Sequence, residues 1–160
     1  RLEELSALLK ELTPTHKVIV WASYRESYPH LRALCEALSL PFAEITGDIK
    51  DKRSEEMRFQ TDPACRVLIG NAQAGGVGIN LTAASYAIYY SRNYSLGDRL
   101  QSEARCHRDG SQLHSAITII DLVARNTLDD EVLSALLRKE QFSDNVLERI
   151  KGKNEVKEPA

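Results

Sequence analysis

Apolar residues along this chain follow two alternating patterns. Short, continuous apolar runs rich in β-branched residues are typical of strands buried on both faces of a parallel sheet. Runs of this kind occupy residues 17–22, 42–46, 66–70, 86–90 and 115–122. Between them, apolar residues recur at the i, i+3, i+4 spacing of a helix with one buried face. The pattern therefore predicts strands that alternate with helices.

Helices are predicted over residues 2–12, 28–38 and 51–60, and two further helices begin after capping signals. Ser95 and Asp98 have the spacing of a capping box, in which side chains bond the free N–H groups of the first turn. Thr127 and Asp130 have the same spacing. An apolar stripe then predicts a long last helix, with Leu128, Val132, Leu133, Leu136 and Leu137 on it.

The alternation predicts a three-layer α/β/α fold with a mainly parallel central sheet, because right-handed crossovers return each helix to one face or the other. Ligands of such sheets gather beyond the carboxyl ends of the strands. The loops after residues 22, 46, 70 and 90 are therefore the candidate sites of chemistry. We expect one domain over residues 1–150 and a polar, disordered tail over 151–160.

The composition of the 160 residues, 42% hydrophobic and 28% charged, fits one soluble globular domain. No apolar run approaches the roughly 18 residues that cross a bilayer, so we expect no membrane insertion. The net charge of −2 gives no overall signature of a nucleic-acid binder. Any contact with DNA must therefore be local.

The three cysteines, Cys35, Cys65 and Cys106, are widely spaced and form no C-x-x-C pair, and the four histidines lack the spacing of metal ligands. We expect no metal site, and a reduced cytosolic setting fits best. The only methionine is Met57, so we expect the chain to be a piece of a longer protein.

The segment 69–82, IGNAQAGGVGINLT, lies between two predicted strands and is rich in glycine. Glycines let backbone N–H groups approach an anion closely, as in a phosphate-binding loop. Gly76 and Val77 stand where a Walker A loop has Lys and Ser/Thr, and Leu81 interrupts a dinucleotide fingerprint. By itself the segment fits either a phosphate loop or a tight turn.

The segment 101–108, QSEARCHR, lies on the helix that follows Ser95. Gln101, Arg105 and Arg108 are four and three residues apart, so they project from one helix face. The arginines are either part of a solvated basic face or a pair held ready for a phosphate group.

Together these segments resemble the C-terminal helicase lobe of the SNF2 family, within helicase superfamily 2. The matching segments are KVIVWASY at 17–24 (motif IV), ITGD at 45–48 with 53–63, AGGVGINLTAA at 74–84 (motif V), QSEARCHR at 101–108 (motif VI), and 127–132 with Lys139. Residues 90–101 are more similar to phage and bacterial members than to chromatin remodellers.

The resemblance implies a RecA-like, P-loop-NTPase-type lobe without its own Walker A motif. It would close over ATP and Mg²⁺ held mainly by an N-terminal RecA-like lobe of the same parent chain. Arg105 and Arg108 would act as arginine fingers on the phosphates. The other implied residues of the ATP cleft are Gly76, Gly78 and Gln101.

The resemblance also implies contacts with a DNA backbone, which would be independent of sequence. The implied DNA-binding residues are Ser23, Tyr24, Arg25, Gly47, Lys52, Arg53, Asn71 and Asn80. Asn80 either contacts a ligand in the cleft or fixes its own loop. The chain departs from the family at 71–73 and 109–111, where it lacks the usual Ser/Thr-Thr-Lys/Arg and Ile-Gly-Gln, and at Ala104.

The sequence contains neither a Walker A lysine nor an Asp-Glu-x-His box, so we expect the isolated chain not to hydrolyse ATP. The predicted function is the second motor lobe of an SNF2-type helicase or translocase on duplex DNA, in a cytoplasmic, bacterial or phage-encoded setting. Two alternatives remain, a non-catalytic RecA-like interaction module and the lobe of an RNA-directed superfamily 2 helicase.

Overall fold

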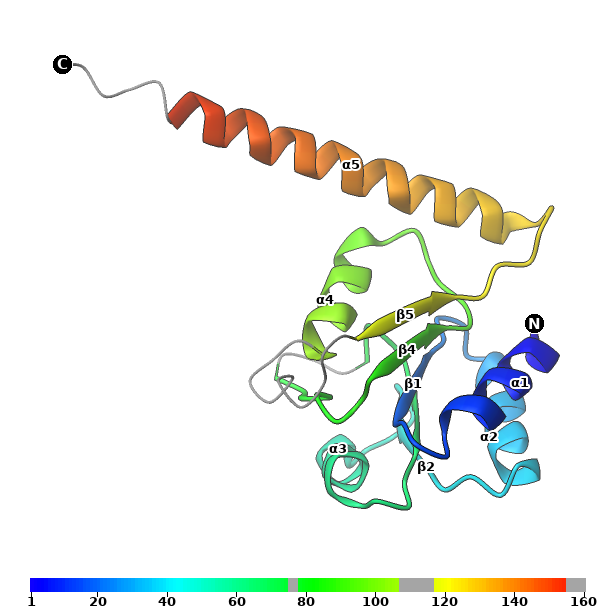
Figure 1. Cartoon of the computed structure of the whole chain (residues 1–160). Coiled ribbons are helices and arrows are strands. Elements are labelled where there is room, and N and C mark those ends of the chain that lie inside the picture. The colour runs from blue at the N-terminus through cyan, green and yellow to red at the C-terminus, as the bar shows by residue number, and fades with distance from the viewer. Residues whose placement is uncertain (75–77, 107–116, 155–160) are drawn as a thin grey trace.

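The protein is built around a five-stranded sheet in the order β2-β3-β1-β4-β5 (Figure 1). The structure is a computed structural model that describes residues 1–74, 78–106 and 117–154, of which 148–154 are described as backbone only. The strands are β1 (Val18–Trp21), β2 (Phe42–Ile45), β3 (Val67–Gly70), β4 (Tyr86–Tyr89) and β5 (Thr118–Asp121). Every neighbouring pair is parallel, which confirms the predicted fold class.

Helices cover both faces of the sheet (Figure 1). They are α1 (Leu2–Leu12), α2 (Ser27–Ala37), α3 (Lys52–Thr61), α4 (Leu96–Cys106) and α5 (Leu128–Asn154). Leu5 and Leu9 of α1 and Leu31 of α2 lie in one hydrophobic core. Phe59 of α3 and Cys106 of α4 lie in the other. Two cores with the sheet between them make the three layers.

The central strand β1 supplies both cores. Val18 and Val20 face α1 and α2, whereas Ile19 and Trp21 face α3 and α4, because side chains alternate along a strand. All four are almost completely buried. Burial of each contributes about 1.5–3 kcal/mol, so β1 is fixed firmly and the loop that follows it starts from a rigid point.

The caps of the last two helices follow the predicted capping boxes only in part. The Asp98 N–H donates to Ser95 Oγ at 3.2 Å, as expected. The Asp98 carboxylate, however, accepts from Gln73 and Asn93 instead of from Ser95. At α5 the Thr127 hydroxyl accepts from the Asp129 N–H at 3.2 Å. Both hydroxyls therefore cap their helices, while the acidic partners bond elsewhere.

The last helix, α5, differs from the prediction in two ways. It runs to Asn154, so residues 151–154, which the sequence analysis placed in the tail, are helical; residues 155–160 lie outside the described ranges. A helix that has started extends easily, since each added residue gains a backbone hydrogen bond. Of the predicted stripe, Val132 and Leu136 are buried, but Leu128 and Leu137 are exposed.

Candidate nucleic-acid and nucleotide interface

A shallow pocket of about 230 Å³ lies beyond the carboxyl ends of β1, β2 and β3. Four of the residues predicted to contact DNA line it, namely Ser23, Arg25, Gly47 and Asn71. They come from three separate loops, and parallel strands bring these loops to the same edge of the sheet. Tyr28 and Asp48 complete the lining. We call this hollow the strand-end pocket.

Hydrogen bonds fix the floor of the strand-end pocket. The Tyr28 hydroxyl donates to the carbonyl oxygen of Ala22 at 3.1 Å, and Asn71 Nδ2 donates to the Tyr28 oxygen at 2.9 Å. Burial raises the pKa of Tyr28, so the phenol stays protonated at neutral pH. Asn71 Oδ1 accepts from the Gln73 N–H at 2.8 Å. The Asn71 amide is thus used inside the lobe, which limits what it can offer to DNA.

The mouth of the strand-end pocket carries its charge. Arg25 Nη2 forms an ion pair with Asp48 Oδ1, and the two side chains are 78% and 42% exposed. Tyr24, next to Arg25, is 45% exposed, and its hydroxyl donates to the carbonyl oxygen of Arg92 at 3.3 Å. Tyr24 and Arg25 are therefore both accessible to a ligand.

A second hollow, of about 610 Å³, lies between α3 and residues 78–80. The predicted residues Lys52, Arg53, Gly78 and Asn80 line it. Lys52 Nζ donates to the carbonyl oxygen of Ala74 and so ties α3 to the glycine-rich segment. Gly78 has a φ of +115°, a conformation that favours glycine strongly. Apart from Tyr24, which lines neither hollow, the structure thus separates the predicted DNA-binding residues into two hollows.

Asn80 fixes its own loop. Its N–H donates to Glu56 Oε1 at 2.8 Å, and its Oδ1 accepts from the Thr82 N–H at 3.1 Å. Of the two roles predicted for Asn80, the structure thus shows the positioning of the loop after residue 78.

Arg105 lies at the same edge of the sheet but is only 3% exposed. Its guanidinium carbon stands 6.0 Å from the centre of the Trp21 ring, and its Nη2 donates to the carbonyl oxygen of Ala72 at 3.3 Å. A solvated basic face is therefore the wrong interpretation for Arg105, because its burial excludes it. In this conformation the side chain is not presented on an open surface either. Gln101 of the same helix is exposed.

Two predicted residues of the ATP cleft, Gly76 and Arg108, lie outside the described ranges. Two acidic residues of α4 bond to other polar side chains. Glu103 pairs with Arg99 at 2.8 Å, and Asp98 accepts from Gln73 at 2.7 Å.

A partly buried charge cluster at the ends of β4 and β5 was missed by the sequence analysis. Asp121 lies 3.1 Å from Arg92 Nη2 and 2.9 Å from Arg99 Nη1. Arg92 is 5% exposed, and this burial lowers the pKa of its guanidinium. Arg99 also stacks 4.7 Å from the Tyr89 ring centre. The signal was available, since Asp121 lies near the end of the predicted strand 115–122 and both arginines follow the predicted strand 86–90.

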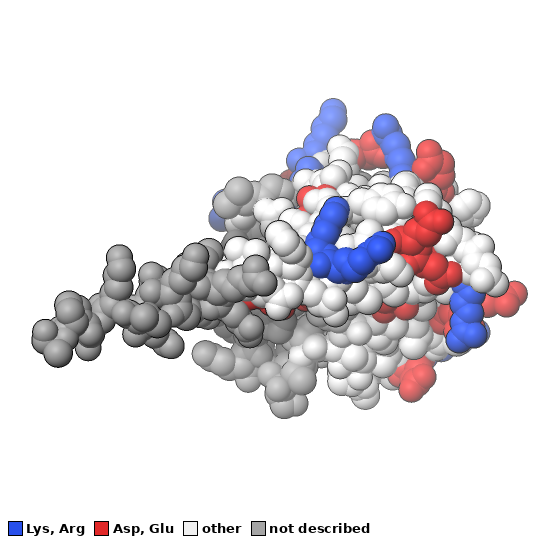
Figure 2. All heavy atoms as spheres, turned by 90° about the horizontal axis from the view of Figure 1, so that it is seen from above, with Lys and Arg blue, Asp and Glu red and all other residues white. Residues whose placement is uncertain are grey.

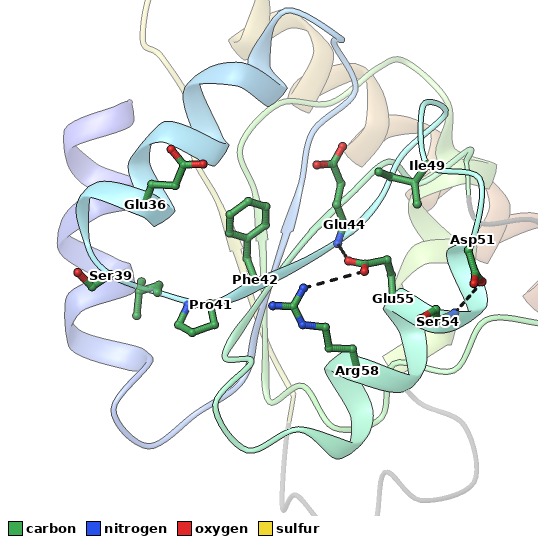
Figure 3. A pocket seen from close by; sticks show the side chains of 11 residues that line it. Glu36, Ser39, Pro41, Phe42, Glu44, Ile49, Asp51, Ser54, Glu55 and Arg58 are labelled. Atoms are coloured by element: carbon green, nitrogen blue, oxygen red, sulfur yellow. Dashed lines mark hydrogen bonds and ion pairs between the residues drawn. The ribbon is translucent and has the colours of Figure 1, made fainter.

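A further hollow, of about 620 Å³, runs along the free edge of β2 between α2 and α3 (Figure 3). Its walls carry Glu36, Glu44, Asp51 and Glu55. Glu55 accepts from the Glu44 N–H at 2.7 Å, so this carboxylate caps the open strand edge. None of the predicted site residues lines this hollow. The Glu55 carboxylate at its wall protects the edge strand β2.

Charge on the surface is mixed. On the face that Figure 2 shows, described basic and acidic side chains stand next to one another, in keeping with the net charge of −2. The described ranges contain no helix long and apolar enough to cross a membrane. They also contain no group of three or more His, Cys, Asp or Glu side chains that could hold a metal ion.

These features define a three-layer α/β lobe whose candidate binding loops lie at the carboxyl edge of a parallel sheet. The profile of the helicase conserved C-terminal domain matches residues 1–110, and the chain therefore belongs to that family. Lymphoid-specific helicase of Homo sapiens is 28% identical over 148 residues, which cover 91% of this chain and 17% of that protein. Helicase SWR1 of Candida glabrata is 26% identical over 152 residues, which cover 93% and 10%.

The crystal structure of the C-terminal part of the Fun30 ATPase domain superposes with a TM-score of 0.77 and 22% identity. The match covers 84% of this chain and 44% of that one, and it supports the fold. The comparisons confirm the SNF2-type helicase resemblance. The relatives named here are eukaryotic and give no support to the narrower likeness to phage and bacterial members.

Proposed function

We propose that this chain is the second motor lobe of an ATP-dependent SNF2-type DNA helicase or translocase. In this proposal an N-terminal lobe of the same protein binds ATP and Mg²⁺, and closure of the two lobes around the nucleotide steps them along the DNA backbone. The main support is the strand-end pocket, in which four residues predicted separately to contact DNA meet at one edge of the sheet.

On the DNA side, Ser23, Tyr24 and Arg25 would hold backbone phosphates of the tracking strand. Arg25 is the strongest of them, because a guanidinium fork can bond two phosphate oxygens at once. Lys52 and Arg53 line the second hollow and would extend the basic track. Contacts of this kind read no sequence, and they weaken as salt rises.

On the nucleotide side, Arg105 and Arg108 would reach the phosphates, with Gln101, Gly76 and Gly78 lining the cleft. Arginine side chains can bond the phosphate groups of ATP. The sequence contains no Walker A lysine that could bond these phosphates. Mg²⁺, once bound, neutralises charge on the phosphates. For Arg105 to act, its guanidinium must leave the Trp21 ring and the Ala72 carbonyl. A guanidinium bonds an anionic phosphate more strongly than a neutral carbonyl oxygen, so closure can drive the exchange.

The experiment is to change Arg108 to Ala in the full-length protein. DNA-stimulated ATP hydrolysis should fall by about 10³ to 10⁵, the usual contribution of an arginine finger, while DNA binding stays nearly unchanged. Arg66→Ala is the matched control, because Arg66 precedes β3 at the opposite edge of the sheet. Normal turnover of the Arg108 variant would refute the finger assignment.

The alternatives give different results in a comparison of duplex DNA, single-stranded DNA and RNA as stimulators. Stimulation by RNA alone would favour an RNA-directed helicase lobe. No stimulation by any nucleic acid would favour a docking module, a role for which the internal use of the Asn71 amide is the supporting observation. A cytoplasmic location stays a prediction, and its bacterial or phage context gains nothing from the relatives named above.

A further inference from the structure

The ion pair at the mouth of the strand-end pocket joins loops that are not neighbours in the sheet. Arg25 follows β1 and Asp48 follows β2, while β3 lies between these strands. The pair therefore reaches over the end of β3, where Asn71 contributes to the pocket lining. A carboxylate thus occupies Arg25 at the place where an incoming anion would meet it.

The dimensions and exposure of the site suit an exchange of anions. The hollow of about 230 Å³ is several times the roughly 30 Å³ that one water molecule takes. It therefore has room for one phosphate group. Both partners are accessible, with side-chain exposures of 78% and 42%. Exposed ion pairs typically contribute only about 0–1 kcal/mol, so a phosphate that bonds the guanidinium through two oxygens can displace the carboxylate.

We propose that the strand-end pocket takes one phosphate group of a nucleic-acid backbone and that Asp48 is a built-in competitor for Arg25. The carboxylate holds Arg25 until the phosphate displaces it, and it then stands as a negative charge beside the bound strand. Asp48 therefore weakens the grip of this loop on the backbone, a useful property in a lobe that must release the strand at every step. This inference rests on the proposed function and assigns Asp48 as a residue that sets affinity.

Glu26 provides a matched control for the removal of one negative charge. It is exposed and follows Arg25 directly in the sequence. Within the described residues it takes part in no ion pair, so Glu26→Gln changes the net charge near Arg25 without releasing the guanidinium. Asp48→Asn changes the net charge by the same amount and does release it. The difference between the two variants isolates the competition.

The test uses the full-length protein without nucleotide. It measures the affinity of this protein for a fluorescently labelled duplex at fixed salt. Asp48→Asn should tighten binding by about three- to fivefold, a factor that matches the upper half of the range for an exposed ion pair. Glu26→Gln should change it by less than about twofold, as expected for screened charge alone. In an Arg25→Gln background, Asp48→Asn should increase the affinity for the duplex no more than Glu26→Gln does, because no guanidinium remains to be released.

The outcomes separate this inference from the function on which it rests. If Arg25→Gln weakens binding but Asp48→Asn increases the affinity no more than Glu26→Gln does, the competition is refuted and the proposed DNA interface stands. An equal gain from Asp48→Asn with and without Arg25 refutes it as well. If Arg25→Gln leaves the affinity unchanged, both the competition and the DNA role of the pocket are wrong. Thermal unfolding checks that all variants fold, and exposed substitutions of this kind should leave the unfolding temperature nearly unchanged.

Discussion

The two halves of the carboxyl edge of the sheet use the same chemistry in different environments. Beyond β1 and β2, Arg25 pairs with Asp48 at the mouth of an open pocket. Beyond β4 and β5, Arg92 and Arg99 share Asp121, and Arg92 is almost completely buried. Cover from α4 and from Leu136 of α5 accounts for the difference, since both line the small cavity that contains Arg92.

The contrast shows that an arginine-aspartate pair does not by itself mark a binding site. A buried pair has lost its water, so removal of one partner leaves an uncompensated charge and costs stability. An exposed pair costs little to open, so it can exchange partners. The β4-β5 half is therefore expected to support the fold, and the β1-β2 half to bind ligands. The four predictions below test this division and the packing around it.

The largest expected effect comes from Asp121→Asn. It removes the carboxylate that pairs with Arg92 and leaves Arg99 paired with Glu103, so the free energy of unfolding should fall by about 3 kcal/mol. Urea denaturation measures the change. Asp48→Asn serves as the control and should stay within about 0.5 kcal/mol. A loss below about 1 kcal/mol for Asp121→Asn would mean that the β4-β5 cluster does not support the fold.

A pair of glycine substitutions tests the open character of the strand-end pocket against the close packing at the end of β3. A Cβ atom at Gly70 would lie 2.7 Å from Cζ3 of Trp21, whereas at Gly47 it would meet nothing within 4 Å. Gly70→Ala should therefore destabilise the lobe by about 1–3 kcal/mol through overpacking. Gly47→Ala should leave stability within about 0.5 kcal/mol. Denaturation followed by the fluorescence of Trp21, the single tryptophan, reports both. Equal losses would contradict the open character of the strand-end pocket.

Arg25→Gln should weaken duplex binding several-fold and reduce the slope of log affinity against log salt by about 0.9, the value for one phosphate contact. Arg66→Gln, at the opposite edge of the sheet, should change neither quantity beyond the effect of net charge. Binding titrations between about 50 and 200 mM salt measure the slope. An unchanged slope for Arg25→Gln would place the phosphate contacts elsewhere on the lobe.

The smallest effect concerns the buried thiols. Burial raises the pKa of Cys35 and of Cys106 to about 12, so both thiols stay protonated well above neutral pH. Alkylation of the folded protein at pH 8 should be slow, because the thiolate is the reacting form. It should become fast when urea unfolds the chain. Rapid labelling of folded protein would show that the helices open locally around these cysteines.

Much of the fold could be predicted because local patterns and global structure agree. The runs at 17–22 and 66–70 are strands because their β-branched residues fill both cores. Element ends were less certain. The last helix extends past the predicted boundary, since nothing in its polar sequence marks where packing against the lobe ends. Of the predicted strand 115–122, residues 118–121 form β5, which is only partly buried because it is an edge strand, and residues 115–116 lie outside the described ranges.

The sequence by itself determined the α/β architecture, the helicase resemblance and the residues of the loops beyond the strands, because these depend on local spacing and on residue types in order. Only the tertiary structure decided that Arg105 is buried against Trp21, that Asn71 is bonded to Tyr28, and that Arg25 meets Asp48 across β3. The physical reason is that exposure and pairing depend on strand order, which brings together loops more than twenty residues apart in the chain.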